Sequence, residues 1–285
     1  MIGEKPAGST ATGSANLAGL RKATSRPWLA TWSLLRREFV RFIRQRHRVF
    51  GALGQPVIFL LLLGGGLGGS FRNPMIAGRQ GYFEYFFPGT LLLVLLFTAI
   101  FSTISVIEDR KEGFLQSVLI SPTPAWAIVL GKTLGGTALA LVQAVVILLA
   151  APLVGIEFHP LAWLGAVGVM FVIALGMTAL GHLIAWRMDS VQGYHAIMNV
   201  ALLPMWLLSG AFFPAAGAAV WMRVVMFINP LTYGLSALRH LLYLREPAMS
   251  AGLPSLLVSV LVAVGATAAT LAGAVFVTRA PVRGV

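Results

Sequence analysis

The stretch EDRKEGFLQSVLISPTP, Glu108 to Pro124, interrupts one of the most apolar parts of this chain. The 285 residues include only nine Asp and Glu residues, and three of these fall within the first five positions of the stretch. A short apolar pattern follows and stops at two prolines, each of which disfavours helix at the residue before it. The stretch therefore predicts a charged segment joined to a short amphipathic helix.

The composition is that of an integral membrane protein. Hydrophobic residues make up 58% of the chain and charged residues only 11%, against about 25% charged residues in a typical soluble domain. The net charge is +12, but ten of the 21 Lys and Arg residues precede position 49. That distribution indicates membrane topology and argues against a nucleic-acid partner. The absence of cysteine excludes disulfides and cysteine metal sites.

Six segments are long and apolar enough to cross a bilayer, which takes about 20 residues. They cover approximately residues 49–70, 86–107, 133–154, 160–186, 194–213 and 253–278. The strands of a membrane barrel would alternate polar and apolar residues, so we expect helices. The predicted fold is an all-α polytopic membrane protein with six transmembrane helices in a domain over residues 49–285. Placing both termini in the cytoplasm puts 16 basic residues inside and 5 outside, as the positive-inside rule requires.

Two segments precede the first predicted span. Residues 1–27 are rich in Gly, Ala, Ser and Thr, which predicts a disordered cytoplasmic tail. Residues 28–48 predict an amphipathic helix lying in the inner headgroup layer. Its apolar stripe contains Trp28, Trp32, Leu35, Phe39 and Phe42, and its basic stripe contains Arg37, Arg41, Arg44 and Arg48. The helix is interpreted either as a topology anchor or as a moving functional part.

Residues 214–252 contain two apolar pieces that are short for a span. The second piece begins with Asn229 in the N-cap position and Pro230 at the first helical position. Tyr233 and Arg239 lie on this same piece. We predict an outer re-entrant helical hairpin between the fifth and sixth spans; a seventh and an eighth full span are the alternative.

Several motifs do not carry chemistry. GGGLGG at 64–69 matches a dinucleotide pattern but ends a span instead of following a strand, and GKT at 131–133 lacks the earlier glycine of a phosphate-binding loop. Lys132 is interpreted as an anchor at the inner start of the third span. No catalytic or metal-binding set is found among the five histidines. The polar residues inside spans are interpreted as interhelical hydrogen-bond partners or as substrate-pathway contacts: Gln55, Gln143 and Asn199.

The helix after the charged residues has one apolar face. Phe114, Leu115, Val118 and Leu119 form that face, and Gly113 just before it indicates either a bend or a close contact. A water-solvated loop has no need of such a face. We therefore expect the face to contact a partner, either the membrane surface or a groove in another protein.

The longer stretch EDRKEGFLQSVLISPTPAWAIVLGKTL, residues 108–134, resembles the signature region of type 2 ABC exporter permeases. The segment INPLTYGLSALR, residues 228–239, resembles the Asn-Pro segment that precedes their last span. The general look is similar to the drug, antibiotic and lipid-exporting branch, including daunorubicin-exporter-like and nodulation-type permeases. One departure is Gln116, where members often have a second acidic residue.

The resemblance implies a transport subunit that is not itself an enzyme. Two copies of a separate ABC ATPase would carry ATP and Mg, with no cofactor on this chain, and a second permease, identical or related, would complete the transporter in the bacterial inner membrane. The residues implied to couple permease and ATPase form a cytoplasmic coupling helix between spans 2 and 3: Glu108, Asp109, Arg110, Lys111, Glu112, Gly113, Phe114, Leu115, Val118 and Leu119.

Because the predicted spans contain no ionised residue, the expected cargo is hydrophobic or amphipathic. A polysaccharide or lipid-linked sugar is the alternative cargo. A secondary transporter driven by an ion gradient is the alternative of a different class.

Overall fold

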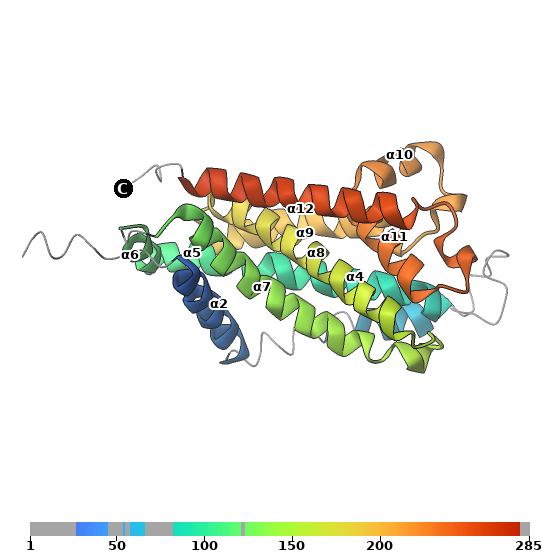
Figure 1. The fold of residues 1–285 in the computed structure, drawn as a ribbon. Helices are drawn as coiled ribbons and strands as arrows, with labels where there is room; N and C mark the ends of the chain where they lie inside the picture. The colour runs from blue at the N-terminus through green and yellow to red at the C-terminus, as the bar shows by residue number, and fades with distance from the viewer. Residues whose placement is uncertain (1–26, 45–53, 55–57, 66–81, 121–122, 280–285) are drawn as a thin grey trace, which may run out of the picture.

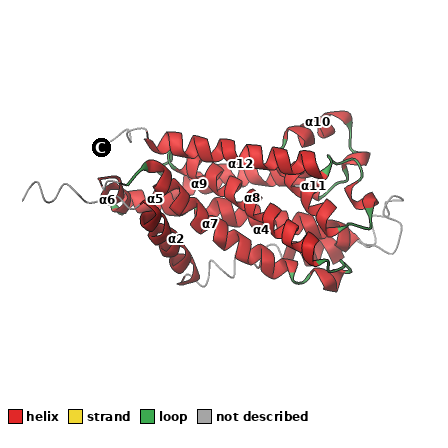
Figure 2. Ribbon diagram, in the orientation of Figure 1, coloured by secondary structure: helices red, strands yellow, loops and turns green. Residues whose placement is uncertain are grey.

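The computed structural model describes residues 27–44, 54, 58–65, 82–120 and 123–279. Every regular element in these ranges is helical (Figure 2), so the prediction of an all-α fold is confirmed for this part of the chain. The predicted N-terminal tail lies outside the described residues, as does most of the first predicted span, residues 49–70. The π-helical segment η2 (Leu60–Gly65) belongs to that span.

The chain folds into five long helical segments and several short ones. The long segments are α4 (Tyr82–Ser102) continued by α5 (Ile104–Lys111), α7 (Ala125–Leu148), α8 (Pro160–Ala185), α9 (Val191–Trp206) and α12 (Leu256–Arg279). The shorter helices are α2 (Pro27–Arg44), α6 (Phe114–Ile120), α10 (Val220–Ile228) and α11 (Pro230–Leu242). Single turns complete the elements: η3 (Ala151–Val154), η4 (Leu207–Ala211), η5 (Ala215–Gly217) and η6 (Pro247–Ser250).

The long helices run side by side, and the short ones gather at the two ends of the bundle (Figure 1). Helices α2, α5 and α6 lie at one end, and α10 and α11 lie at the other. The C-terminal end of α12 lies at the same end as α6. The sequence predicts these two segments on one side of a membrane, and the arrangement of the bundle is compatible with that topology.

Four helices are long and apolar enough to be candidate spans: 82–111, 125–148, 160–185 and 256–279. The predicted span 160–186 matches α8 closely. The predicted span 133–154 overlaps α7, which begins at Ala125 and ends at Leu148. Helix α9 has only 16 residues, although η4 follows it directly. The count of six spans stays a prediction.

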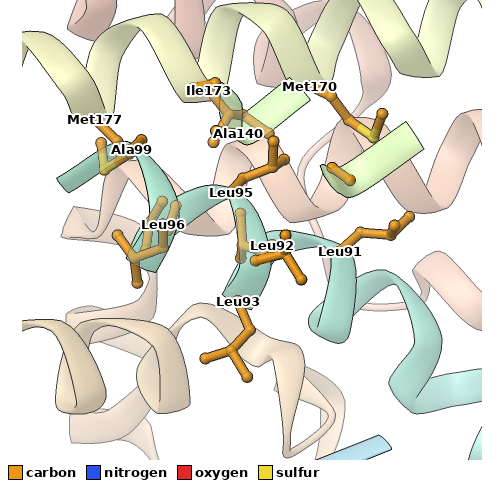
Figure 3. Close-up of a cluster of buried hydrophobic side chains, with 14 of the residues drawn as sticks. Leu91, Leu92, Leu93, Leu95, Leu96, Ala99, Ala140, Met170, Ile173 and Met177 are labelled. Carbon is orange, nitrogen blue, oxygen red and sulfur yellow. The ribbon is translucent and has the colours of Figure 1, made fainter. Parts of the chain in front are cut away.

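Helix α4 is the centre of the bundle. It is apolar on all sides, and such a helix is stable only when other helices surround it. The side chains from Leu91 to Leu96 are buried. In Figure 3, Leu95 points toward Ala140 of α7 and Ile173 of α8, while Leu93 points to the opposite side of α4. Lipid tails are as apolar as these side chains, so close packing, more than water exclusion, holds such a helix in a membrane protein.

A proline inside α4 is compensated from a distant part of the chain. Pro88 has no N–H, so it cannot donate to the carbonyl of Glu84 one turn earlier. The hydroxyl of Tyr243 donates to that carbonyl instead, over 2.5 Å. One turn of α4 is thereby fastened to the chain just after α11.

Helix α11 begins as the sequence predicts. The Asn229 side chain accepts a hydrogen bond from the Leu231 backbone N–H at 3.0 Å, and Pro230 occupies the first turn. The apolar face is fully buried and consists of Leu231, Leu235, Leu238 and Leu242. Helices α10 and α11 are both too short to count as spans; the prediction that they re-enter the membrane stays a prediction.

Candidate functional site: an ion-paired elbow

The charged stretch of the sequence forms a bend, which we call the elbow, made of α5, α6 and the residues between them (Ile104–Ile120). Gly113 has a φ of +76° and separates the two helices. This left-handed conformation favours glycine, because a Cβ would crowd the neighbouring carbonyl. The bend predicted at Gly113 is therefore confirmed.

The elbow is attached to α8 by Arg110. Its guanidinium donates hydrogen bonds to the carbonyls of Ala185 at 2.8 Å and Met188 at 3.2 Å, and it pairs with Asp189 at 3.2 Å. Carbonyls at the C-terminal end of a helix lack intrahelical partners, and a cation there is favourable. Arg110 thus faces its own chain.

Asp109 is the centre of a buried group of charges. Its side chain is completely buried and accepts hydrogen bonds from both Arg37 nitrogens, at 2.7 and 2.8 Å, and from Arg41 at 3.1 Å. The Lys132 ammonium donates to the same carboxylate at 2.5 Å. Hydrogen bonding to Asp109 raises the pKa of Arg37 above its ordinary value. A single carboxylate is therefore bound by three cations from two other helices.

Two further acids complete the group. Lys132 also donates to Glu38 at 2.9 Å, and Arg41 donates to Glu108 at 3.0 Å. Glu38 and Lys132 are almost as buried as Asp109. We call this set the ionic cluster: Arg37, Glu38 and Arg41 of α2, Glu108 and Asp109 of α5, and Lys132 of α7.

Helix α2 reaches the cluster because α7 offers it a surface of small residues. A Cβ at Gly131 would stand 2.8 Å from the Leu34 Cβ, and one at Gly135 would stand 2.7 Å from the Glu38 Cβ. Only glycine permits such an approach, as in other membrane helix pairs with small residues four apart. The sequence GKTLGG thus forms a packing seam, with Lys132 between the two glycines.

Lys132 lies inside α7 and is buried by its carboxylate partners. The guanidinium groups of Arg37 and Arg41 contact the elbow. The anchor role of Lys132 and the place of α2 in a headgroup layer stay predictions. Arg44 is exposed, and Arg48 lies outside the described residues.

The apolar stripe of α2 differs along its length. Trp28 and Trp32 are largely exposed, with Trp28 in edge contact with Trp126 of α7 at 5.3 Å between ring centres. Phe39 is partly buried. Exposed tryptophans on a membrane protein are typical of the interface between lipid and water.

The apolar face of α6 is partly covered by the chain itself. Leu115 is only 1% exposed and belongs to the main hydrophobic core. The guanidinium of Arg37 lies over the ring of Phe114, 3.8 Å from its centre, a cation–π contact. Val118 is partly buried, and the side chain of Leu119 lies outside the described part. Among the elbow side chains that the structure describes, the exposed ones are polar: Lys111, Glu112, Gln116 and Ser117.

At the opposite end, Arg239 is buried without a carboxylate partner among the described residues. Its guanidinium lies 4.1 Å from the centre of the Tyr85 ring and donates to the Gly210 carbonyl at 3.1 Å. Weaker contacts reach the carbonyls of Tyr85 and Met249, both at 3.5 Å. The predicted hairpin residue Arg239 therefore joins α11 to α4 and η4, while Tyr233 donates only to the Phe227 carbonyl within the hairpin.

The three candidate pathway residues lie apart. Gln143 of α7 is buried and accepts a hydrogen bond from Thr98 of α4 at 2.7 Å, which fits the interhelical interpretation. Asn199 is exposed on α9. Gln55 lies outside the described residues. The structure does not bring Gln143 and Asn199 into one site.

No group of three or more His, Asp or Glu residues in the described ranges is arranged to hold a metal ion. The elbow presents exposed polar side chains and is bonded to α2, α7 and the end of α8. The ABC-2 type transporter family matches residues 30–243, a range that contains the ionic cluster and both ends of the bundle. The chain belongs to this family.

Curated relatives agree with this assignment. This chain is 25% identical to a daunorubicin resistance ABC transporter permease of Streptomyces coeruleorubidus, over 79% of each chain. It is 26% identical to nodulation protein J of Rhizobium leguminosarum bv. viciae, over 74% of this chain and 80% of the relative. A transport permease of Cyanophora paradoxa is 25% identical, over 73% and 72%. This chain is thus an ABC transporter permease, a transmembrane transport subunit.

Sequence reasoning missed two residues of this permease, Glu38 and Lys132. Glu38 is the only acidic residue between positions 27 and 83, and it lies among four arginines. A single acidic residue among several arginines predicts that it forms an ion pair. The pairing of Lys132 carried no such signal, because its two partners are 23 and 94 residues away in sequence.

Proposed function

We propose that this chain is the permease subunit of an ATP-driven exporter that moves a hydrophobic or amphipathic molecule across the bacterial inner membrane. The family normally works with an ABC ATPase, and the relatives named for daunorubicin resistance and nodulation favour a drug-like or lipid-like cargo. Two ATPase subunits binding ATP and Mg, and a second permease chain, would complete the transporter. Both termini and the elbow would face the cytoplasm.

The observation that carries the proposal is that the elbow has an exposed polar side and a side anchored in the core of the bundle. Helix α6 presents polar, exposed residues outward while Leu115 ties it to the core of the bundle. A surface of this kind suits a reversible contact with a soluble subunit, since non-obligate interfaces are about as polar as ordinary protein surface. We therefore propose that the ATPase contacts the elbow through Lys111, Glu112, Gln116 and Ser117.

The mechanism follows from rigid-body coupling. Closure of two ATPases on ATP would displace the elbows docked on them. Each displacement would pass through α5 to α4 and through α7 to the rest of the bundle, and would change the pathway between the two permeases. This chain would contribute motion and a pathway, with hydrolysis taking place on the partner.

The test uses the full-length permease co-expressed with the ATPase encoded beside it. Gln116→Arg together with Ser117→Trp should abolish stimulated ATP hydrolysis and ATP-dependent daunorubicin uptake into inverted vesicles, with no change in thermal stability. A substitution at Leu115 is unsuitable, since loss of a core side chain would also unfold the permease. The matched control is Gln192→Arg, an exposed residue at the start of α9.

Two results would contradict the proposal. Full stimulated hydrolysis in the Gln116→Arg, Ser117→Trp variant would show that the ATPase docks elsewhere. Daunorubicin uptake by the permease without any ATPase, driven by an ion gradient, would favour a secondary transporter.

A further inference from the structure

We propose that the ionic cluster is a clasp that makes the elbow and α2 move as one body with α7, so that the cluster transmits the motion of the ATPase. The inference rests on the proposed function and adds a role for residues outside the docking surface. Lys132, Asp109 and Glu38 would be positioning residues for coupling. None of them would touch cargo or nucleotide.

The contact between Lys132 and Asp109 closes a loop in the chain. The two residues are 23 positions apart, one before α6 and one after it. Every residue of α6 therefore lies between the two ends of this link. The link holds the end of α5 to α7 on either side of α6, and Gly113, with its positive φ, is the point between α5 and α6 where the chain could bend if the link were lost.

Helix α2 holds the same loop from the side. Arg37 and Arg41 both bind Asp109, and Arg41 also reaches Glu108, so α2 contacts the elbow at two successive acids. Glu38 of α2 binds Lys132 of α7, on the other side of the loop from α5. A movement of α6 that opened the angle between α5 and α7 would break the bonds of α2 to α5 and to α7.

Stability alone is a poor reason to retain such a cluster. Removing charges from water is unfavourable, and apolar residues of similar size in place of a buried ion pair are often as stable or more stable. Charged hydrogen bonds fix the relative position of two helices, because each donor must lie close to its acceptor and point toward it. Arginine adds a planar donor pair, which binds Asp109 through two parallel bonds and sets the angle between α2 and α5.

The decisive variant releases α7 from the clasp without stranding a charge. Glu38→Leu with Lys132→Met eliminates one buried anion and one buried cation together, and Asp109 keeps Arg37 and Arg41 as partners. We expect the variant to fold with nearly unchanged thermal stability. We also expect it to stimulate the ATPase within about two-fold of the unmodified permease, because the docking surface is intact.

The readout is motion at the far end of the bundle. The chain has no cysteine, so Val220→Cys on exposed α10 provides a single site for an environment-sensitive maleimide dye. ATP with vanadate should change the fluorescence of this label in the assembled transporter. In the Glu38→Leu, Lys132→Met background we expect the change to be at least about five-fold smaller. The control background is Glu157→Gln with Arg245→Gln, which removes an exposed ion pair remote from the elbow.

Each outcome is decisive. A full fluorescence change in the clasp variant would overturn the inference, as would a label that never responds to ATP in the unmodified transporter. Loss of stimulated hydrolysis in the clasp variant alone would also contradict it, because the cluster would then belong to the docking surface. Failure of the unmodified permease to stimulate any ATPase would instead overturn the proposed function.

Discussion

Lys132 Nζ lies 2.5 Å from Asp109 Oδ2 although α6 and the start of α7 separate the two residues in sequence. Both side chains are almost fully excluded from solvent. The charged stretch of the sequence is therefore not a solvated loop, and its most important acid points into the protein. Four predictions follow from this arrangement and from the contacts at the opposite end.

Asp109 should be the acid on which the elbow depends most. Asp109→Leu removes the carboxylate that three cations share, and we expect it to lower the free energy of unfolding by about 3 kcal/mol, as for a broken buried ion pair. Glu108→Gln is the matched control, because Glu108 is partly exposed and such pairs contribute about 1 kcal/mol or less. Thermal unfolding of the purified permease in detergent measures both. Equal losses would show that burial does not set the strength of these bonds.

Gly113 should tolerate no side chain without strain. A Cβ there meets no atom within 4 Å, so the cost of Gly113→Ala comes from its positive φ alone, about 1–2 kcal/mol. The strain should shift α6 and reduce stimulated ATP hydrolysis by the co-expressed ATPase. Gly168→Ala in α8 is the control, since its Cβ also meets nothing and alanine favours helix. Unchanged stability and hydrolysis in Gly113→Ala would mean that the bend is not maintained.

Arg239 should not be replaceable by lysine. Its planar guanidinium reaches carbonyls on both α4 and η4 while lying over the Tyr85 ring, a geometry that an ammonium cannot reproduce. We expect Arg239→Lys to destabilise the permease by about 2 kcal/mol, in the range of hydrogen bonds to charged groups. Arg245→Lys, at a largely exposed position, should leave the unfolding temperature unchanged. A similar effect at both positions would contradict the role given to Arg239.

Asn229 should act through two separate bonds. Its Oδ1 caps α11, and its Nδ2 donates to the Met205 carbonyl at the end of α9. Asn229→Ala loses both bonds and should cost more than the roughly 1 kcal/mol of a lost N-cap. Asn229→Ser keeps a capping oxygen and loses the donor to Met205. The stability of this variant should therefore lie between that of the unmodified permease and that of Asn229→Ala. If serine were as destabilising as alanine, the cap would contribute nothing here.

Local features of the chain were the most predictable from sequence. The start of α8 at Pro160 and the cap of α11 at Asn229 depend on backbone chemistry within a few residues, and the prediction placed both correctly. The predicted third span begins after Lys132, whereas helix α7 begins at Ala125, so that Lys132 lies inside the helix. A neighbouring carboxylate can keep a lysine inside a helix bundle, and that neighbour comes from elsewhere in the chain.

The face of α6 shows the same limit. Its Phe-Leu pattern correctly indicated an amphipathic helix, but periodicity does not say whether the apolar side meets a partner protein or the helix's own bundle. Leu115 fills the protein's own core and Phe114 lies beneath Arg37. Among the described side chains of α6 the exposed ones are polar, Gln116 and Ser117, and the proposed docking residues include both.

By itself the sequence determined that this is an all-helical membrane protein with charge concentrated at one bend, because composition and hydrophobic length follow directly from residue type. Only the tertiary structure decided what those charges do. Glycines at 131 and 135 let α2 approach α7 closely enough for Glu38 to reach Lys132. The strength of an ion pair depends on distance and burial, and both are set by the packing of helices far apart in sequence.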